Sequence, residues 1–401
     1  MAHSNALERV RKGNLCSGCG GCALVAGGKV NMEIQKPGYA RPKQTEPLTA
    51  AENEAVWSIC PGLGQAVDRS GRNDDILWGP YLQAYRGFAA DPELRFKASS
   101  GGALSALLHF LLQQGRVDGV IEVSADPDNP IGNITVMRTD REGIVASAGS
   151  RYAPSSPLAD LSDYLDRDQT FAVVGKPCDI AALRALRDQR ADIAQTFPVL
   201  ISFFCAGVPS LEGAEQILRD LGTSLSETNS FRYRGHGWPG RATAYLNDGR
   251  SLSMTYHESW GKILSRHVQH RCKICADGSG AAADIVCADV WETDSRGYPL
   301  FEEQDGQSLI MTRTPLGQDI LDGASAAGAI TLDAFELNEL EAIQPGQTRR
   351  RKALLARVLA LRLMGAPVPL YKGLHLFAAA KQNSLAENLR NFLGMVRRRF
   401  T

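Results

Sequence analysis

The sequence predicts an α/β fold, α+β overall, with a small module before the central domain and a helical flank after it. Three observations predict it. Two apolar runs, "FAVVG" and "FPVLISFF", flank a helical pattern in mid-chain, as parallel strands joined by a helix do. Three cysteines within seven residues mark the N-terminal module, and arginine-rich helical patterns mark the C-terminal flank.

Composition and charge argue against two classes of partner. The 401 residues include 44 basic and 44 acidic side chains, so no overall field attracts nucleic acid. No apolar run reaches the roughly 18 residues of a membrane span. The first residues, "MAHSNALERV", lack the apolar core of a signal peptide, so we expect a cytoplasmic protein.

The N-terminal stretch "CSGCGGC" predicts thiol ligands. Cytoplasmic cysteines stay reduced, so clustered thiols indicate a metal site rather than disulfides. Cys16, Cys19 and Cys22 have the CxxCxxC spacing of a [4Fe-4S] site, with glycines that permit a tight loop. Cys60, which precedes a proline in "SICPG", is the candidate fourth ligand. The alternative is structural zinc, which usually takes two separated CxxC pairs.

Four more cysteines predict a second thiol site. Cys178 follows the run "FAVVG", and Cys205 ends the next apolar run. If these runs are parallel neighbours, both thiols lie at the carboxyl edge of one sheet, where open α/β folds build their sites. Cys272 and Cys275 form a CxxC pair that could close over this edge, which suits a second [4Fe-4S] cluster. Cys178 or Cys205 could instead be an ordinary buried thiol, and Cys287 is expected in the core.

A candidate anion site precedes an apolar helix. In "FKASSGGALSALLHFLLQQG" we expect the helix from about 103 to 114. Ser99, Ser100, Gly101 and Gly102 would let a phosphate approach the free backbone N–H groups of its first turn. The same residue types are common in ordinary N-caps and loops, so the motif alone is a weak signal.

The segment "SFRYRGHGWPG" combines cationic, aromatic and flexible residues. Arg232, Arg234, His236 and Trp238 could lie over a bound ring system. The alternative interpretation is a surface turn of glycine and proline with an aromatic ring packed beneath it. No residue can be assigned as a catalytic proton donor from the sequence.

The C-terminal residues differ from the rest in composition. "QTRRRKALLARVLALRLMG" and "SLAENLRNFLGMVRRRF" are helical patterns rich in arginine, separated by the helix-breaking "APVPLYKG". Such helices could dock on a partner or on an anionic membrane surface. The alternative, which we favour, is a helical flank packed on the main domain with solvated arginines.

Together these segments resemble the coenzyme F420 hydrogenase/dehydrogenase beta-subunit family, which is related to the ferredoxin-dependent chlorophyll-pathway reductases. The similarity runs from about Cys16 to Arg313. The motifs that carry it, in family order, are "CSGCGGC", "CPG", "RFKASSGGALSALL", "GSRYAPS", "GKPCDIAALR", "FFCAG", "RGHGWPG" and "HRCKICADGSGAAADI".

The resemblance implies an FAD-containing iron–sulfur protein with two [4Fe-4S] clusters. The residues that it implies for the FAD phosphate are Ser99, Ser100, Gly101 and Gly102. Lys176 and Arg151 would lie near the flavin or its phosphates. The cluster ligands that it implies are Cys16, Cys19, Cys22 and Cys60 for one cluster, and Cys178, Cys205, Cys272 and Cys275 for the other.

With the resemblance, we expect three parts in the chain. Residues 1–80 would form a ferredoxin-like iron–sulfur module, residues 81–340 an FAD-binding α/β domain with the second cluster, and residues 341–401 a basic helical flank. The chain departs from the family at one place, because relatives commonly have Gly-Asp after the "ADI" strand where this chain has Cys287-Ala288-Asp289. The larger Ala288 would narrow that part of the site, which leaves the substrate open.

The resemblance implies a flavin-dependent iron–sulfur oxidoreductase. Electrons would move between the clusters and a flavin that reduces or oxidises a small organic substrate, or coenzyme F420, with ferredoxin or another redox protein as partner. Two alternatives remain. The chain could be a non-catalytic electron-transfer subunit that docks through its basic tail, or a zinc-stabilised binding protein without a redox role.

Overall fold

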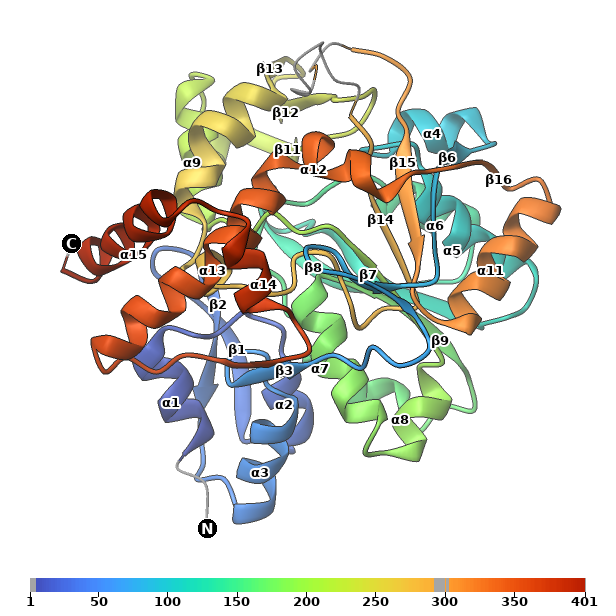
Figure 1. The fold of residues 1–401 in the computed structure, drawn as a ribbon. Helices are drawn as coiled ribbons and strands as arrows, with labels where there is room; N and C mark the ends of the chain where they lie inside the picture. The colour runs from blue at the N-terminus through green and yellow to red at the C-terminus, as the bar shows by residue number, and fades with distance from the viewer. Residues whose placement is uncertain (1–4, 292–299, 301–302, 401) are drawn as a thin grey trace.

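The computed structural model describes residues 5–291, 300 and 303–400, and its largest sheet has eight strands (Figure 1). The strand order is β16-β6-β15-β14-β10-β9-β7-β8. The bounds of these strands are β6 Gln83–Ala89, β7 Gly119–Ala125, β8 Asn133–Arg138, β9 Phe171–Gly175, β10 Val199–Phe203, β14 Ile285–Asp289, β15 Ser308–Thr312 and β16 Ile330–Ala334.

The middle of this sheet is parallel. β7 pairs with β9, β9 with β10, and β10 with β14 in parallel register, whereas the outer pairings are antiparallel. The connection from β9 to β10 contains α7 (Pro177–Arg187) and α8 (Ala191–Thr196). The prediction of two parallel strands joined by a helix is therefore confirmed, and Cys178 and Cys205 both follow the carboxyl ends of these strands.

Helices cover both faces of the sheet. On one face α5 (Ala103–Gln113), α6 (Arg141–Ser147) and α11 (Pro315–Ala326) pack over Ala172 and Val174 of β9. On the other face α7 and α8 pack over Phe171 and Val173 of the same strand. A strand buried on both faces needs an unbroken apolar sequence, and this is why "FAVVG" contains no polar residue.

The N-terminal residues form a smaller unit at the lower left of Figure 1. It contains α1 (Ala6–Gly13), α2 (Gly21–Val25), the antiparallel hairpin of β1 (Val30–Gln35) and β2 (Tyr39–Gln44), and α3 (Ala50–Ile59). The Asn5 side chain caps α1, and Thr49 forms a capping box with Glu52 at the start of α3. The short strands β3 (Gly64–Ala66), β4 (Asn73–Asp75) and β5 (Gly79–Tyr81) lead to the main sheet.

A second antiparallel sheet with one helix lies beside the carboxyl edge of the main sheet. It contains α9 (Leu211–Asp220) and the antiparallel strands β11 (Thr228–Arg232), β12 (Arg241–Leu246) and β13 (Ser251–Thr255), which share one apolar core. A π-helix (His257–Ile263), a 3-10 helix (Leu264–His267) and α10 (His270–Lys273) then bring the chain to the CxxC pair.

The C-terminal flank packs on the N-terminal unit. It contains α12 (Leu340–Ile343), α13 (Pro345–Leu363), β17 (Leu370–Lys372), α14 (Leu376–Lys381) and α15 (Leu385–Phe400). β17 pairs in parallel with β3, and Leu354 and Val358 share an apolar core with Val10 and Leu63. The flank is thus part of the folded core. The favoured interpretation placed it on the main domain, and it is right for part of the flank, because Leu340 and Ile343 pack with Leu309 of β15.

One arginine of this flank corrects the expectation that its arginines are solvated. Arg351 is 4% exposed. Its guanidinium donates to the backbone oxygens of Ile76, Leu77, Ala276 and Leu374, so it joins three separate segments. Over the described part of the chain, no helix is long and apolar enough to cross a membrane.

Candidate functional site

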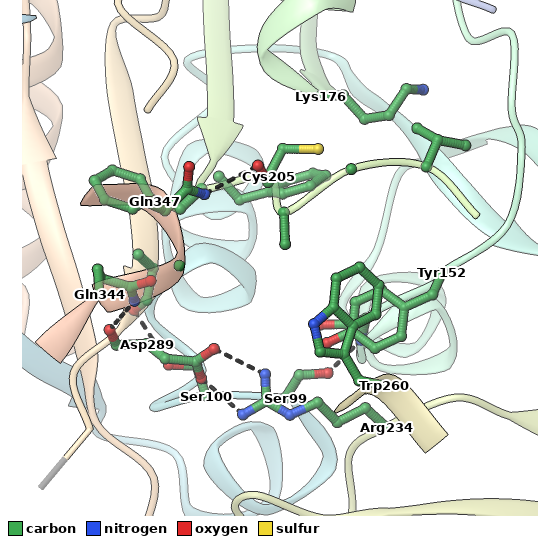
Figure 2. A pocket seen from close by; sticks show the side chains of 18 of the residues that line it. Ser99, Ser100, Tyr152, Lys176, Cys205, Arg234, Trp260, Asp289, Gln344 and Gln347 are labelled. Carbon is green, nitrogen blue, oxygen red and sulfur yellow. Dashed lines mark hydrogen bonds and ion pairs between the residues drawn. The ribbon is translucent and has the colours of Figure 1, made fainter. Parts of the chain in front are cut away.

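A cavity of about 1090 Å³ lies at the carboxyl edge of the parallel strands (Figure 2). Its wall includes the ends of β7, β9, β10 and β14, the loop before α5, and the start of α13. Open α/β sheets bind ligands at this edge because the loops that follow parallel strands converge there. The volume is at the upper limit of the roughly 300–1,000 Å³ of ordinary ligand pockets, so there is room for a large ligand.

The predicted anion site is in this wall. Ser99, Ser100 and Gly102 line the cavity immediately before α5. Gly102 has a φ of +74°, and no described side chain caps the helix, so the first N–H groups of α5 keep donor capacity. The Ser100 hydroxyl donates to the Gln307 oxygen at 2.8 Å, which ties the loop to the segment before β15. The position suits an anion, and its assignment to a phosphate stays a prediction.

Gly101 lies behind the wall. A Cβ at Gly101 would come within 2.7 Å of the Gly87 oxygen and 2.8 Å of the Ser308 nitrogen. The Gly101 oxygen also accepts a hydrogen bond from the Ala89 nitrogen at 2.7 Å. Close packing of the loop against β6 and β15 therefore requires a glycine here, whether or not a phosphate approaches it.

Lys176 and Arg151 both line the cavity, and the charged group of each has hydrogen-bond partners within the protein. The Lys176 ammonium lies 2.8 Å from Asp179 and donates to Ser155 Oγ at 2.9 Å. Burial disfavours the ammonium, but the charge of Asp179, its hydrogen bond to Lys176 and the neighbouring thiols Cys178 and Cys205 together outweigh burial and raise the pKa of Lys176 above its ordinary value. Arg151 donates to Asn133 and to the backbone oxygens of Gly132 and Phe231, so its guanidinium holds the wall together.

The segment "RGHGWPG" places one cation in the cavity. Arg234 is 2% exposed and binds both carboxylate oxygens of Asp289 at 2.8 Å, as Figure 2 shows. Its guanidinium lies 4.7 Å from the ring of Tyr256 and 5.0 Å from that of Trp291. Trp238 stacks on Trp291 and donates to Asp289 at 2.8 Å. Each interpretation of this segment is thus partly right, because the cation lines the cavity while the tryptophan is packed beneath the wall.

The other two residues singled out in this segment have local contacts. Arg232 donates to the Tyr245 hydroxyl and to Thr243 on β12. The ring of His236 lies 5.7 Å from that of Phe96. Tyr152 and Trp260, whose rings lie 4.8 Å apart, add to the aromatic surface that Tyr256 and Trp291 give the cavity (Figure 2).

Glu122 is a buried carboxyl group in the wall that sequence reasoning missed. It lies on β7, is 6% exposed, and none of the described residues donates a hydrogen bond to its Oε1. Burial raises the pKa of Glu122 to about 7, against smaller effects of Ser147 and Arg138 in the opposite direction. A carboxyl group that titrates near neutrality in a cavity can exchange a proton with a ligand. A charged residue inside the apolar run "GVIEV" was the available signal.

The first predicted thiol set comes together in the structure. Cys16 and Cys19 lie in the loop between α1 and α2, Cys22 in the first turn of α2, and Cys60 at the end of α3. All four line one small pocket. Burial raises the pKa of Cys19 to about 12 and that of Cys60 to about 11, and the charges of neighbouring thiols add to this effect.

Glycines shape this loop as the sequence predicted. Gly18 and Gly20 have φ values of +84° and +88°, which other residues rarely adopt. A Cβ at Gly20 would also come within 2.6 Å of the Ala159 nitrogen. The CxxCxxC loop therefore needs glycine at Gly20 both for its backbone angle and for its packing.

The second predicted thiol set gathers at the sheet edge. Burial raises the pKa of Cys205 to about 12, and negative charge on Cys272 and Cys275 would add to this effect. Cys178, in the first turn of α7, has Cys205 of its own set and Cys19 of the first set among the charges that act on it. Gln269 donates to the Ser17 oxygen in the loop of the first set at 3.2 Å and to Cys272 Sγ of the second set at 3.6 Å, so the two thiol sets lie close together.

Neither thiol set has the arrangement of a site for a single metal ion. In the described ranges, no three His, Cys, Asp or Glu side chains come close enough together to bind a single metal ion. Cys287 packs in the core of the main sheet, as expected, although it also lines the cavity. Burial raises the pKa of Cys287 to about 12.

Helices of the C-terminal flank supply a cationic part of the cavity wall. Arg350 and Arg357 of α13 and Arg390 of α15 line the cavity with Lys273 of α10. Burial lowers the pKa of Arg357, and together with the charges of Arg398 and Arg350 it brings this pKa to about 10. Burial, Arg398 and Arg357 also lower the pKa of Lys273. Because these cations repel one another, an anion bound among them would stabilise this wall.

The carboxylate in this part of the wall is used elsewhere. Glu387 accepts hydrogen bonds from the backbone nitrogen and the hydroxyl of Ser384, both at 2.8 Å, and so caps α15. The sequence predicts these arginines in solvent or at a docking surface, whereas the structure places them in the cavity wall. Their contribution depends on α13 and α15 folding back over the sheet edge, which no local pattern predicts.

Two adjoining family models match this chain. The model described as "Coenzyme F420 hydrogenase/dehydrogenase, beta subunit N-term" matches residues 84–162, and the corresponding C-terminus model matches residues 168–337. The chain belongs to this family. The matched residues contain the main sheet and most of the cavity wall, whereas the C-terminal flank lies beyond both models.

Individual relatives agree with this assignment. The chain is 25% identical to the coenzyme F420 hydrogenase subunit beta of Methanococcus voltae over 73% of this chain and 99% of that protein. It is 35% identical to the F420-dependent formate dehydrogenase 1 subunit beta of Methanococcus maripaludis over 63% of this chain and 62% of that protein. It is 23% identical to the coenzyme F420-dependent sulfite reductase of Methanocaldococcus jannaschii over 82% of this chain, but spans only 49% of that protein.

A solved structure has the same fold. It is a chain of the F420-reducing [NiFe] hydrogenase complex from Methanosarcina barkeri, with a TM-score of 0.53 and 23% identity over 70% of this chain and 95% of that chain. The named relatives are oxidoreductases or their subunits, so the comparisons support a redox role for this family member.

Proposed function

We propose that this chain is an FAD- and [4Fe-4S]-dependent oxidoreductase that moves electrons between two clusters and a flavin in the cavity. The observation that carries the proposal is that Gln269 bonds both the loop of the first four-thiol set and Cys272 of the second, while Cys205 and Cys272 line the cavity. A [4Fe-4S] cluster takes four thiolates, one for each iron, and both sets supply that number. Zinc in these sites is the alternative that metal analysis would distinguish.

The cavity fits a flavin dinucleotide in size and chemistry. Ser99, Ser100 and the N–H groups at the start of α5 would hold a phosphate, and Lys176 would add positive charge nearby. Tyr152 and Trp260 offer aromatic faces for a ring system. A flavin accepts two electrons at once or one at a time, so it connects hydride chemistry to one-electron carriers.

Two residues of this chain would have tasks in such a reaction. Glu122, which is buried and titrates near neutrality, would hold or release a proton at its carboxyl group. Arg234, fixed by Asp289, would present a positive charge that stabilises negative charge developing on a bound ligand. For each substrate molecule reduced by two electrons, ferredoxin or another one-electron protein would deliver two electrons, and solvent would supply the protons.

The cationic wall indicates the class of substrate. Lys273, Arg350, Arg357 and Arg390 would bind an organic substrate that carries carboxylates or phosphates away from its reacting ring. The relatives are named for coenzyme F420, so this deazaflavin is the first candidate, and another small conjugated anion is the second. Ala288 also lines the cavity, at the place where relatives commonly have glycine.

A stopped-flow experiment tests this function. Anaerobic protein would be mixed with reduced coenzyme F420 and, in a separate experiment, with reduced ferredoxin. The absorption band of the oxidised flavin would be followed in both experiments. Loss of the flavin absorption with both donors, and transfer of electrons from one donor to the oxidised form of the other through the protein, would support the proposal. A flavin that neither donor reduces would contradict it.

A second candidate function is an electron-transfer subunit whose substrate chemistry lies on a partner. The observation that favours it is an exposed apolar stripe on α15, where Leu385, Leu389 and Leu393 are 90%, 58% and 55% exposed at a spacing of four residues. Deleting residues 341–401 would not separate the candidates, because Leu354 and Arg351 belong to the core. Substrate turnover by the isolated chain with ferredoxin alone would exclude this candidate, and flavin reduction without turnover would favour it.

A further inference from the structure

Arg271 lies between the two thiol sets. It directly precedes Cys272 on α10, so it belongs to the second set by sequence. Its Nη2 donates to the Pro61 oxygen at 2.8 Å and to Gln65 Oε1 at 3.3 Å, and Pro61 directly follows Cys60 of the first set. The side chain of Arg271 thus reaches from the backbone beside Cys272 to the segment that follows Cys60.

Arg271 also has hydrogen-bonding capacity that the protein does not use. The residue is 2% exposed, yet within the described chain nothing accepts a hydrogen bond from its Nε or Nη1. Its guanidinium lies 5.9 Å from the ring of Tyr371, which closes the site on that side. Leaving a buried charged donor unpaired costs free energy, so a ligand group is expected to take these protons.

The charge of Arg271 acts on thiols of both sets. Burial raises the pKa of Cys16 and of Cys60, and the positive charge of Arg271 opposes this effect at both. Cys178 and Cys275 are among the charges that act on Arg271 from the second set. One buried cation therefore faces both sites.

We infer that Arg271 sets the reduction potentials of both clusters, through its fixed charge and the N–H groups of its two unpaired nitrogens, Nε and Nη1. The inference rests on the proposed function, because it requires both clusters. Reduction adds one negative charge to a cluster, and a nearby buried cation stabilises that charge and raises the potential. Hydrogen bonds from Nε–H and Nη1–H to cluster sulfur act in the same direction. Because one cation acts on both clusters, it raises both potentials and so favours the entry of electrons without holding them at one cluster.

The test is a reductive titration of each cluster, followed by electron paramagnetic resonance on anaerobic protein. In Arg271→Met we expect the reduction equilibrium of both clusters to become at least tenfold less favourable, which is 59 mV for a one-electron couple. Arg271→Lys keeps the charge and should recover at least half of that shift. Potentials unchanged in Arg271→Met, or equally shifted in Arg271→Met and Arg271→Lys, would overturn the inference.

Arg313→Met is the matched control. Arg313 is also fully buried with an unpaired Nε among the described residues, but the charges that act on it are Asp277, Arg72 and Asp75. This variant should leave both potentials unchanged, and an equal shift would mean that the effect of Arg271 is unspecific.

Iron content separates a failed inference from a failed function. Wild-type protein without about eight irons would refute the proposed function, whereas eight irons with potentials insensitive to Arg271 would refute only the inference. Arg271→Gln, which keeps an N–H donor without the charge, replaces Arg271→Met if that variant binds less iron. If neither neutral variant binds eight irons, Arg271 has a structural role and the inference is wrong.

Discussion

Replacing Glu122 by glutamine is expected to remove a pH-dependent cost of folding. In the folded protein Glu122 has a pKa of about 7, because burial disfavours its charge, whereas the ordinary value is 4.5. The stability that the neutral carboxyl group contributes is fully present below pH 4.5 and is lost as the pH rises through 7. The difference corresponds to about 3 kcal/mol above pH 8, since each pKa unit is about 1.4 kcal/mol.

The assay is urea unfolding of wild type and Glu122→Gln under anaerobic conditions at pH 5 and pH 8.5. The variant should gain about 2.5 kcal/mol in free energy of unfolding relative to wild type between these pH values. Glu336→Gln, at an exposed position, is the control and should give the same difference from wild type at both pH values. A Glu122→Gln difference that does not change with pH would refute the assignment of a neutral buried carboxyl group.

Three further predictions concern the cofactor sites. Cys19→Ala should lose about four irons and retain flavin, because the first thiol set lies apart from the cavity wall; full iron in this variant would refute that set. Gly101→Ala should lower flavin content, because its Cβ would meet the Gly87 oxygen at 2.7 Å, whereas Gly394→Ala, with open space around it, should not; equal flavin in both would count against the loop before α5. Arg390→Gln should raise the KM of an anionic substrate roughly tenfold at low salt, with little change in kcat, and a KM unaffected by the substitution would argue against the cationic wall.

The sequence predicted those parts of the fold and site that depend on local pattern. The apolar run "FAVVG", its helix and the next strand specify parallel neighbours, because strands buried on both faces must be apolar throughout. The spacing of Cys16, Cys19 and Cys22 requires the tight glycine loop that the structure contains. Cys60 and the CxxC pair were found because cysteines are rare enough that their spacing is informative.

The remaining features depend on contacts between distant segments. Arg234 and Asp289 are 55 residues apart and meet only because the loop after β11 covers the end of β14. The pKa of Glu122 is raised because helices bury β7, and the sequence of β7 alone does not predict this burial. The arginines of α13 and α15 reach the cavity because the flank packs across the N-terminal unit, whereas their pattern alone is equally typical of a solvated or docking helix.

The proposed function requires that the two thiol sets hold iron–sulfur clusters beside a flavin. The most direct measurement is iron, acid-labile sulfide, zinc and released flavin per chain, with an absorption spectrum, on anaerobically purified protein. We predict about eight irons, about eight sulfides and one FAD, since two [4Fe-4S] clusters are proposed. Zinc in place of iron, in protein that releases no flavin, would contradict the proposed function.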